Sequence, residues 1–392
     1  MTALNVRVGE VAEQIRGVTY GKNDATDAAQ NGYLPILRAG NITDTGTAFD
    51  DLVYVPEHCI SPKQFLRSGD VLIAASSGSL DVVGKTTSIL SDYEGAFGAF
   101  CKVLRPNQLR VDARYFANFF KTAEYRRTVS RLAAGANINN LRNEHLDDLL
   151  IPLPSLPEQR RIAAILDKAD ALRAKRREAL AQLDRLAQSI FVEMFGDPTE
   201  NPLNWACKPL GSVVRTASGG TPDRSHQAYY GGTIPWVKSG ELHRRMIRET
   251  EEHITQAGLE SSSAKLMPPG TVLVAMYGAT VGAVSQLAIS AATNQAICCM
   301  QPSPEVSASY LIAFLEHYKP SLLKRRVGGA QPNLSQDSLR SIPLPIPSLE
   351  AQVEFERRID AIHKLEEIHL QSSGEMENLL GSLQHRAFLG QL

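Results

Sequence analysis

The sequence predicts an α+β protein of duplicated, pseudo-two-fold architecture, in which two mixed α/β domains alternate with two long helices packed as an antiparallel coiled coil. Three observations predict this fold: an internal repeat spanning most of the 392 residues, short strand-like runs in both copies, and heptad-like spacing in two helical segments. A repeat of about 195 residues is too long for a solenoid unit, so it indicates domain duplication.

The repeat is clearest where each domain gives way to a helix. Residues 141–159 read LRNEHLDDLLIPLPSLPEQ and residues 334–352 read LSQDSLRSIPLPIPSLEAQ. The shared Pro-x-Pro-Ser-Leu-x-x-Gln stretch ends at Gln159 and at Gln352, an offset of 193 residues. A duplicated chain of this kind suits a function that needs two similar sites at a set distance.

Pattern divides the chain into four segments: a first domain over 1–157, a first spacer helix over 158–196, a second domain over 197–350 and a second spacer helix over 351–392. Strand-like runs at 71–74 and 271–275 each follow a turn that contains glycine. The prolines before each helix push the preceding residues out of the α region, which predicts a rigid, extended lead-in.

The two helical segments carry matching apolar seams at steps of three and four. Their opposite net charges favour pairing, although exposed ion pairs contribute little each. The alternative is that each helix packs only on its own domain. The residues expected to pair the helices are Ile162, Ile165, Leu172, Leu183, Leu186 and Ile190 in the first, and Phe355, Ile362, Leu365, Met376, Leu379 and Leu383 in the second.

Composition describes an ordinary globular protein, with 43% hydrophobic and 21% charged residues. The net charge of −1 counts against an isolated high-affinity nucleic-acid binder, but it allows a subunit whose partners share the phosphate contacts. An odd number of cysteines, five, fits reduced thiols. Without a signal peptide or an apolar run near 18 residues, we expect a cytoplasmic protein that does not enter the membrane.

Catalytic motifs are not evident in the sequence. The stretch from Gly78 to Thr86 ends like a phosphate-binding loop, but five residues separate its glycines where the P-loop needs four, and the second copy has Ala283 in place of Lys85. Histidines and cysteines show no zinc-ligand spacing, and no methyltransferase cofactor or catalytic loop is found. We therefore expect neither catalytic residues, nor a metal, nor a cofactor in this chain.

Recognition chemistry remains. Arginine and lysine can bridge the acceptors of guanine, and asparagine or glutamine can pair with adenine. A capping or surface role is the alternative for each such residue. The candidate DNA-binding residues are Arg38, Asn41, Lys85, Asn139 and Arg142 in the first copy, and Lys238, Tyr277, Arg325, Arg326 and Gln331 in the second.

The chain resembles the specificity subunit of type I restriction-modification enzymes. The resemblance lies in the order of two variable domains and two long helices, in the repeated Pro-x-Pro-Ser-Leu-x-x-Gln entry, and in the lead-ins before Leu141 and Leu334. It also includes the matching helix ends Leu-x-x-Ser-Ile from Leu186 and Leu-x-x-Ser-Leu from Leu379. It covers nearly the whole chain.

The resemblance implies that each domain is a target recognition domain that reads one half of a split, asymmetric DNA sequence. The helices would serve as a molecular ruler and as docking sites for two modification subunits, which bind S-adenosylmethionine and methylate adenine. Restriction subunits, where present, would bring ATP and Mg²⁺ for translocation and cleavage. This chain would then be the non-catalytic, double-stranded-DNA-recognising subunit of the complex.

Two other hypotheses remain at this point. One is a two-headed scaffold whose domains bind protein or glycan ligands, with the coiled coil as spacer. The other is a specificity module for a related enzyme that cleaves and methylates through a fused partner.

Overall fold

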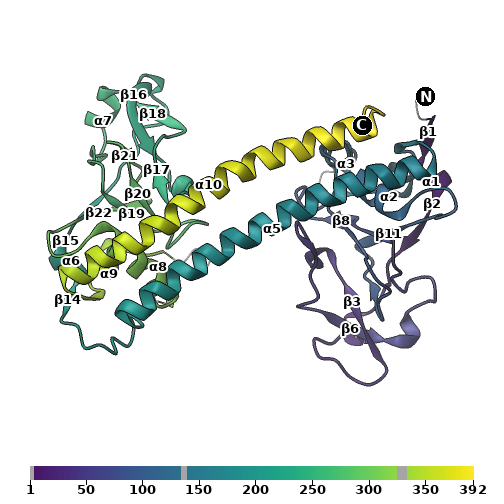
Figure 1. Ribbon diagram of the computed structural model, residues 1–392, viewed down its shortest axis with the longest axis horizontal. Coiled ribbons are helices and arrows are strands. Elements are labelled where there is room, and N and C mark those ends of the chain that lie inside the picture. The colour runs from purple at the N-terminus through teal and green to yellow at the C-terminus, as the bar shows by residue number, and fades with distance from the viewer. Residues whose placement is uncertain (1–3, 134–138, 325–332) are drawn as a thin grey trace. The chain divides into compact units, whose positions relative to one another are not determined.

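The structure is a computed structural model that describes residues 4–133, 139–324 and 333–392. The chain forms two compact units: unit 1 contains residues 1–179 and 369–392, and unit 2 contains residues 180–368 (Figure 1). Helices α5 (Leu156–Phe195) and α10 (Leu349–Phe388) each begin in one unit and end in the other. Each unit therefore holds one lobe, the start of one long helix and the end of the other.

Lobe 1, the part of unit 1 before α5, combines short strands with four α-helices in its described residues, 4–133 and 139–155. Its strands are β1 (Leu4–Arg7), β2 (Ala12–Arg16), β3 (Tyr33–Leu37), β4 (Ile42–Thr43), β5 (Gly46–Thr47), β6 (Val53–Pro56), β7 (Val71–Ala74), β8 (Ser76–Ser77), β9 (Thr86–Ser88), β10 (Ala96–Phe97), β11 (Cys101–Pro106), β12 (Asn139–Asn140) and β13 (Leu150–Leu153). Its helices are α1 (Val8–Val11), α2 (Ala113–Phe119), α3 (Ala123–Ala133) and α4 (Asn143–Asp147), with 3₁₀ turns η1 (Lys22–Asp24), η2 (Ala39–Asn41) and η3 (Glu57–Cys59).

Lobe 2, between the long helices, repeats this plan. Its strands are β14 (Cys207–Pro209), β15 (Val214–Ser218), β16 (Tyr230–Val237), β17 (Met246–Ile247), β18 (Glu252–Ile254), β19 (Val272–Ala275), β20 (Val284–Leu287), β21 (Ala292–Thr293), β22 (Ile297–Pro302) and β23 (Pro343–Pro345). Its helices are α6 (Leu210–Val213), α7 (Gln256–Glu260), α8 (Ala308–Lys324) and α9 (Gln336–Arg340), with 3₁₀ turns η4 (Gln227–Tyr229) and η5 (Ser239–His243).

The main sheets of the two lobes correspond strand for strand. Lobe 1 has the order β2-β11-β7-β9, and lobe 2 has β15-β22-β19-β20 with a fifth strand, β17, beyond β20. All four residues of β7, and all four of β19, are buried, which explains why both runs are continuously apolar. Each lobe has a second, three-stranded sheet, β10-β3-β6 and β18-β16-β21. The predicted α+β class and the duplication are confirmed.

A short antiparallel ribbon closes each lobe beside its long helix. Strand β1 pairs with β13, with Leu4 opposite Leu153, and β14 pairs with β23, with Cys207 opposite Pro345. The proline-containing lead-ins of the repeat are thus the second strands of these ribbons. Such ribbons bring the start of each lobe back to the segment that enters its helix.

A buried glutamine joins each lobe to its helix. Gln159 is fully buried; its Oε1 accepts a hydrogen bond from the backbone N–H of Asp112 at 2.8 Å, and its Nε2 donates to the carbonyl of Pro154 at 2.8 Å. The hydroxyl of Tyr115 donates to the carbonyl of Pro152 at 2.8 Å. These bonds satisfy backbone groups that would otherwise be buried without partners.

The same joint recurs in unit 2. Gln352 is also fully buried; it accepts from the N–H of Ser307 at 2.8 Å and donates to the carbonyl of Pro347 at 3.0 Å. Tyr310 donates to the carbonyl of Pro345 at 2.8 Å. The repeated Pro-x-Pro-Ser-Leu-x-x-Gln stretch is therefore the sequence of this joint.

The end of each long helix packs into the lobe of the unit that it enters. In unit 1 the Phe388 ring lies 5.1 Å from that of Tyr115, and in unit 2 the Phe195 ring lies 4.9 Å from that of Tyr310. Phe195 also packs at 5.3 Å from Phe355, near the start of α10. Within each unit the start of one helix thus lies beside the end of the other, which is an antiparallel arrangement.

The buried seam differs in phase from the predicted one. Ile162, Phe355 and Ile362 are buried, and Leu183, Ile190 and Leu383 are partly buried against the cores. Ala187, next to the predicted seam residue Leu186, is partly buried as well. Leu166 and Ile359 are buried while Ile165 is only half-buried, and Met376 is half-buried as well. The structure leaves four predicted seam residues about half exposed: Leu172 (48%), Leu186 (49%), Leu365 (48%) and Leu379 (56%).

Packing against the lobe explains why the buried seam of each long helix differs from the predicted one. Near the joint each helix packs against its partner helix and against its lobe at once, so the buried stripe turns toward the lobe by one residue. Ion pairs continue the helix contact further along: Glu377 lies 3.3 Å from Arg173 and 2.9 Å from Arg177 in unit 1, and Glu193 lies 3.5 Å from Arg358 in unit 2.

Substitution of either joint glutamine should cause a large loss of stability. Gln159→Leu and Gln352→Leu should each lower the free energy of unfolding by about 2–4 kcal/mol, because at least two buried backbone groups lose their partners. Urea denaturation of the full chain measures this effect. Gln371→Leu, at an exposed site on α10, is the matched control and should change stability by less than about 0.5 kcal/mol. Equal midpoints for all three variants would contradict the role of the joint.

Candidate functional site

Arg38 and Lys238 occupy the same place in the two lobes. Each follows a central strand of the smaller sheet, β3 or β16, and precedes a 3₁₀ turn, η2 or η5. The backbone N–H of Arg38 donates to Oδ1 of Asn41 at 2.8 Å, and that of Lys238 donates to Oε1 of Glu241 at 2.8 Å. The turn is thus fixed by a polar cap, and the cationic side chain before it is left 40% exposed in Arg38 and 31% exposed in Lys238.

Asn41, which was predicted as a DNA contact, is buried inside the lobe. It is only 4% exposed, and its Nδ2 donates to the carbonyl of Asp50 at 2.8 Å while its Oδ1 caps the turn. Glu241, its counterpart, is 2% exposed and also accepts from the N–H of Glu251 at 3.1 Å. Both ends of the Asn41 amide are engaged inside the lobe, so this residue shapes the loop and presents no free edge to a base.

Carboxylates hold both cationic side chains. Arg38 lies 2.9 Å from Asp51, and Lys238 lies 2.8 Å from Glu251 and 3.1 Å from Glu252. Hydrogen bonds to these two glutamates raise the pKa of Lys238, and the bond from Lys238 lowers the pKa of Glu251. These carboxylates were not among the residues predicted from the sequence, although the same spacing of 13 residues separates Arg38 from Asp51 and Lys238 from Glu251.

Lobe 2 adds an aromatic and cationic cluster that was not predicted from the sequence. The Arg224 guanidinium lies 4.6 Å from the centre of the Tyr230 ring and 5.1 Å from that of Trp236, and it forms a 2.7 Å ion pair with Glu252. Through Glu252 this cluster is continuous with Lys238. Cations stacked on aromatic rings are held in place and still present charge.

Lys85 and Tyr277 lie near the turns that follow β8 and β19. Lys85 is one-third exposed and forms a 3.2 Å ion pair with Asp44, while Arg126 supports the turn by donating to the carbonyl of Val83 at 2.6 Å. Tyr277 is half-buried, and burial raises its pKa. The stretch at 78–86 that resembles a phosphate-binding loop thus belongs to the connection between β8 and β9.

The segment that leads into α4 carries the next candidates. The backbone of Asn139 pairs with Ser77 across β12 and β8, and Arg142 is exposed, 3.2 Å from Glu144 and hydrogen-bonded to His145. This pairing places the backbone of Asn139 beside β8, the strand from which the connection that carries Lys85 leads to β9. Arg325, Arg326 and Gln331 lie outside the described residues.

Lys102, on β11, anchors this segment from inside the lobe. Its side chain is 9% exposed, and its Nζ donates to the carbonyl of Leu141 at 2.7 Å and to Oδ1 of Asn143 at 2.8 Å. Burial, together with the charge of Arg16, lowers the pKa of Lys102 to about 8. Its counterpart in lobe 2 is Cys298, so this anchor belongs to lobe 1.

Among the described residues no group of three or more His, Cys, Asp or Glu side chains is placed to hold a metal ion. No helix in the described part of the chain is long and apolar enough to cross a membrane. What the arrangement offers is a pair of oriented cations, Arg38 and Lys238, at matched turns of the two lobes.

The lowered pKa of Lys102 predicts a pH-dependent stability. Between about pH 8 and the ordinary lysine value of 10.5 the unfolded chain keeps a proton that the folded chain has lost, so stability should rise with pH across this window. Below it both states are charged, and the cost of burying the charge is fully present. Lys102→Met removes the titrating group and should lack this rise relative to the wild type. The urea midpoints of the two proteins are compared at about pH 7.5 and about pH 10. If both midpoints change by the same amount between these pH values, the predicted role of Lys102 is wrong.

Comparison with known proteins places these features in context. The family model of the type I restriction modification DNA specificity domain matches the chain twice, over residues 4–183 and 202–378. The chain is 28% identical to the type I restriction enzyme StySPI specificity subunit of Salmonella potsdam, over 98% of this chain and 88% of that protein. It is 40% identical to the EcoKI specificity subunit of Escherichia coli K12, over 47% of this chain and 40% of that protein.

Two solved structures share the fold. A chain from a study of complex assembly and conformational transition of the type I R-M system aligns with a TM-score of 0.55 at 20% identity, covering 100% of this chain and 98% of that one. The type I restriction-modification S subunit from M. genitalium aligns with a TM-score of 0.57 at 14% identity, covering 99% of each chain. At these identities the likeness concerns the fold.

Proposed function

Because this chain belongs to the family of type I restriction-modification DNA specificity subunits, we propose that its two lobes read the two halves of a bipartite, asymmetric DNA target. The observation that carries the proposal is the double match of the specificity domain to two lobes with a common frame and different loops. One frame presents different side chains, so each lobe selects its own half-site. As a specificity subunit, the chain recognises DNA and leaves catalysis to its partners.

The matched turns after β3 and β16 support this proposal. They place Arg38 and Lys238 at equivalent positions, and the capping residues Asn41 and Glu241 keep the turns alike while the exposed chemistry differs. Arginine can bridge the two acceptors of guanine, whereas lysine acts as a point charge. Paired carboxylates hold both side chains in a defined direction, which favours base reading over loose phosphate contact.

The long helices support two equivalent docking surfaces. Leu172 and Leu365 are counterparts in the repeat, as are Leu186 and Leu379, and all four are about half exposed. Each unit contains one leucine of each pair. Two modification subunits, carrying S-adenosylmethionine for adenine methylation, would dock on these surfaces, and restriction subunits with ATP and Mg²⁺ would join where the system has them. The helices would then set the spacing between the half-sites.

Lobe exchange tests the proposal directly. A chain in which residues 1–157 are replaced by those of another specificity subunit, expressed with the modification subunit of the system, should methylate a target changed in one half only. Sequencing of methylated adenines measures this. Exchange of residues 197–350 is the matched experiment and should change the other half. A change in both halves, or in neither, would refute one-lobe, one-half-site reading.

Single substitutions test the matched turns. Arg38→Gln and Lys238→Gln should each weaken binding of the methyltransferase complex to its target by about 1–3 kcal/mol and relax the sequence at one half-site. Fluorescence anisotropy at fixed salt, with methylation mapping, measures both effects. Arg67→Gln, at another exposed site of lobe 1, controls for the change in net charge. If Arg67→Gln weakens binding as much as Arg38→Gln, the turn has no special role.

A further inference from the structure

Backbone hydrogen bonds place four segments of lobe 1 side by side. The turn after β10 begins at Gly98, whose N–H donates at 2.9 Å to the carbonyl of Leu37, the last residue of β3. The same turn reaches Phe100, whose carbonyl accepts from the N–H of Ser76 in β8 at 3.0 Å. Ser76 is paired with Asn140 across β8 and β12. The order of neighbours is therefore the end of β3, the turn after β10, β8 and β12.

Polar and apolar side chains alternate along these neighbouring segments. Arg38, the residue after β3, is 40% exposed, and Asn140 at the other end is exposed. The turn between them carries Phe100, which is 70% exposed, and β8 carries the half-exposed Ser77. We refer to Arg38, Phe100, Ser77 and Asn140 as the lobe 1 row.

The exposed Phe100 ring stands on a turn whose backbone is fixed. The N–H of Cys101 donates to the carbonyl of Gly98 at 2.8 Å, which closes the turn. Phe97 before the turn and Cys101 after it are both buried. Single exposed apolar side chains are common on protein surfaces, but most of them are not held in this way. A ring on a fixed backbone loses little conformational freedom when a ligand contacts it.

Lobe 2 has the same turn with different side chains. The N–H of Asn294 donates to the carbonyl of Val237 at 2.9 Å, and the N–H of Met276 donates to the carbonyl of Ala296 at 2.8 Å. These bonds match those of lobe 1 one for one, so Ala296 has the position that Phe100 has in lobe 1. Ala296 is 4% exposed. On the same backbone an alanine is covered, so the phenyl ring extends beyond the surrounding surface.

The neighbouring segment shows the opposite difference. Lobe 1 has Ser77 where lobe 2 has Tyr277, because Ser76 and Met276 make equivalent bonds to the turn. The aromatic side chain thus comes from the turn after β10 in lobe 1 and from the segment after β19 in lobe 2. The hydroxyl of Tyr277 can donate and accept hydrogen bonds, whereas the phenyl ring of Phe100 can do neither. The two lobes therefore offer a ligand different chemistry on a common backbone.

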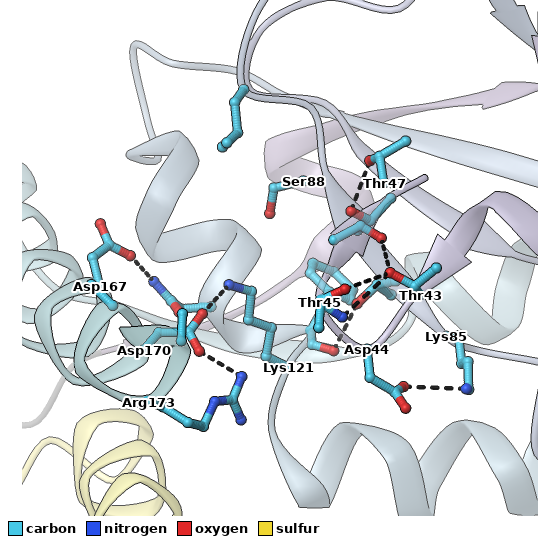
Figure 2. A pocket seen from close by; sticks show the side chains of 18 of the residues that line it. Thr43, Asp44, Thr45, Thr47, Lys85, Ser88, Lys121, Asp167, Asp170 and Arg173 are labelled. Atoms are coloured by element: carbon cyan, nitrogen blue, oxygen red, sulfur yellow. Dashed lines mark hydrogen bonds and ion pairs between the residues drawn. The ribbon is translucent and has the colours of Figure 1, made fainter. Parts of the chain in front are cut away.

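The lobe 1 row is separate from the groove of unit 1. That groove is lined by the β4–β5 hairpin, and its cations Lys85 and Lys121 are paired with Asp44 at 3.2 Å and Asp170 at 3.0 Å (Figure 2). The four residues of the row, all in the described part of lobe 1, do not line it. The row thus belongs to the outer surface, where a large ligand can reach it, and not to a cavity that would enclose a small molecule.

Duplex DNA offers an apolar ring a specific partner in its major groove. Lobe 1 lies within a match to a DNA specificity domain, so its ligand is DNA. Base edges in the major groove present hydrogen-bond donors and acceptors, and thymine adds a 5-methyl group on which a phenylalanine ring can pack. Arg38 and Asn140, on either side of Phe100 in the row, are of the types that bond guanine and adenine.

We infer that Phe100 reads the 5-methyl group of a thymine in the half-site that lobe 1 binds. The inference rests on the proposed function and names one base contact of that site. Lobe 2 has Ala296 at the equivalent position and makes no such contact there. The difference at this one position therefore contributes to the asymmetry of the target.

Replacement of thymine by uracil, which lacks only the 5-methyl group, tests this inference. Sequencing of methylated adenines first maps the target, and each thymine of a target duplex is then replaced in turn. One replacement in the half-site of lobe 1 should weaken binding by the complex of this chain with its modification subunit roughly three- to five-fold, the loss expected for one buried methyl group. In the Phe100→Ala complex the same replacement should have no effect. A scan in which no response depends on Phe100 would overturn the inference.

Phe100→Ala should fold as the wild type, because the ring is exposed and lobe 2 has an alanine at this position; thermal unfolding verifies this. Leu109→Ala is the matched control: it truncates an 87% exposed side chain beyond the other end of β11 and should keep the response to uracil. Loss of assembly with the modification subunit in Phe100→Ala would overturn the inference, because the ring would then belong to a protein interface. A lobe exchange over 1–157 that changes neither half-site would instead refute the proposed function.

Discussion

The architecture depends on one buried interaction made twice: the side-chain amide of a glutamine that bonds the backbone of a lobe to the entry of a long helix. Gln159 and Gln352 are fully buried, and each satisfies a backbone N–H from the segment before the lobe helix and a carbonyl from the proline lead-in. The carbonyls of Pro154 and Pro347 in the lead-in accept these side-chain hydrogen bonds, so their hydrogen-bonding capacity is satisfied inside the protein. A geometry fixed by backbone groups does not depend on which side chains the loops carry, so the lobes can diverge in what they recognise.

The sequence was sufficient for the elements whose signals are local. The long helices were expected over 158–196 and 351–392 and run from Leu156 to Phe195 and from Leu349 to Phe388. The sequence could not predict which residues of each helix form the buried seam, because Ile165 and Leu166 are adjacent and equally apolar. Only the lobe, a third packing surface that no heptad pattern describes, decides that Leu166 is the buried one.

The candidate site divides in the same way. Equivalence in the repeat was enough to select Arg38 and Lys238, whose positions in the two lobes do correspond. It could not separate a base-reading amide from a structural one, because Asn41 has the residue type of both. The counterpart Glu241 carried that information: a carboxylate is a poor replacement for a base-reading amide but an equal replacement for a cap that accepts an N–H.

The duplication also shows which interactions differ between the two copies. Lys121, Asp170, Arg173 and Glu377 form a chain of ion pairs in unit 1. Their counterparts in unit 2 are Glu316, His363, Glu366 and Asp184, a set that has lost the alternation of charge. Burial raises the pKa of Glu366, and burial together with Arg245 lowers the pKa of His363 to about 4.

Partly exposed ion pairs contribute little net stability, so either pattern is tolerated at these positions. Losing a buried partner of a backbone group costs more, about 1–3 kcal/mol for each group. This difference explains why the glutamine joint is identical in the two units while the charges beside it are not. The two halves of the chain are therefore alike in how their backbones are joined and distinct in what their surfaces offer to a partner.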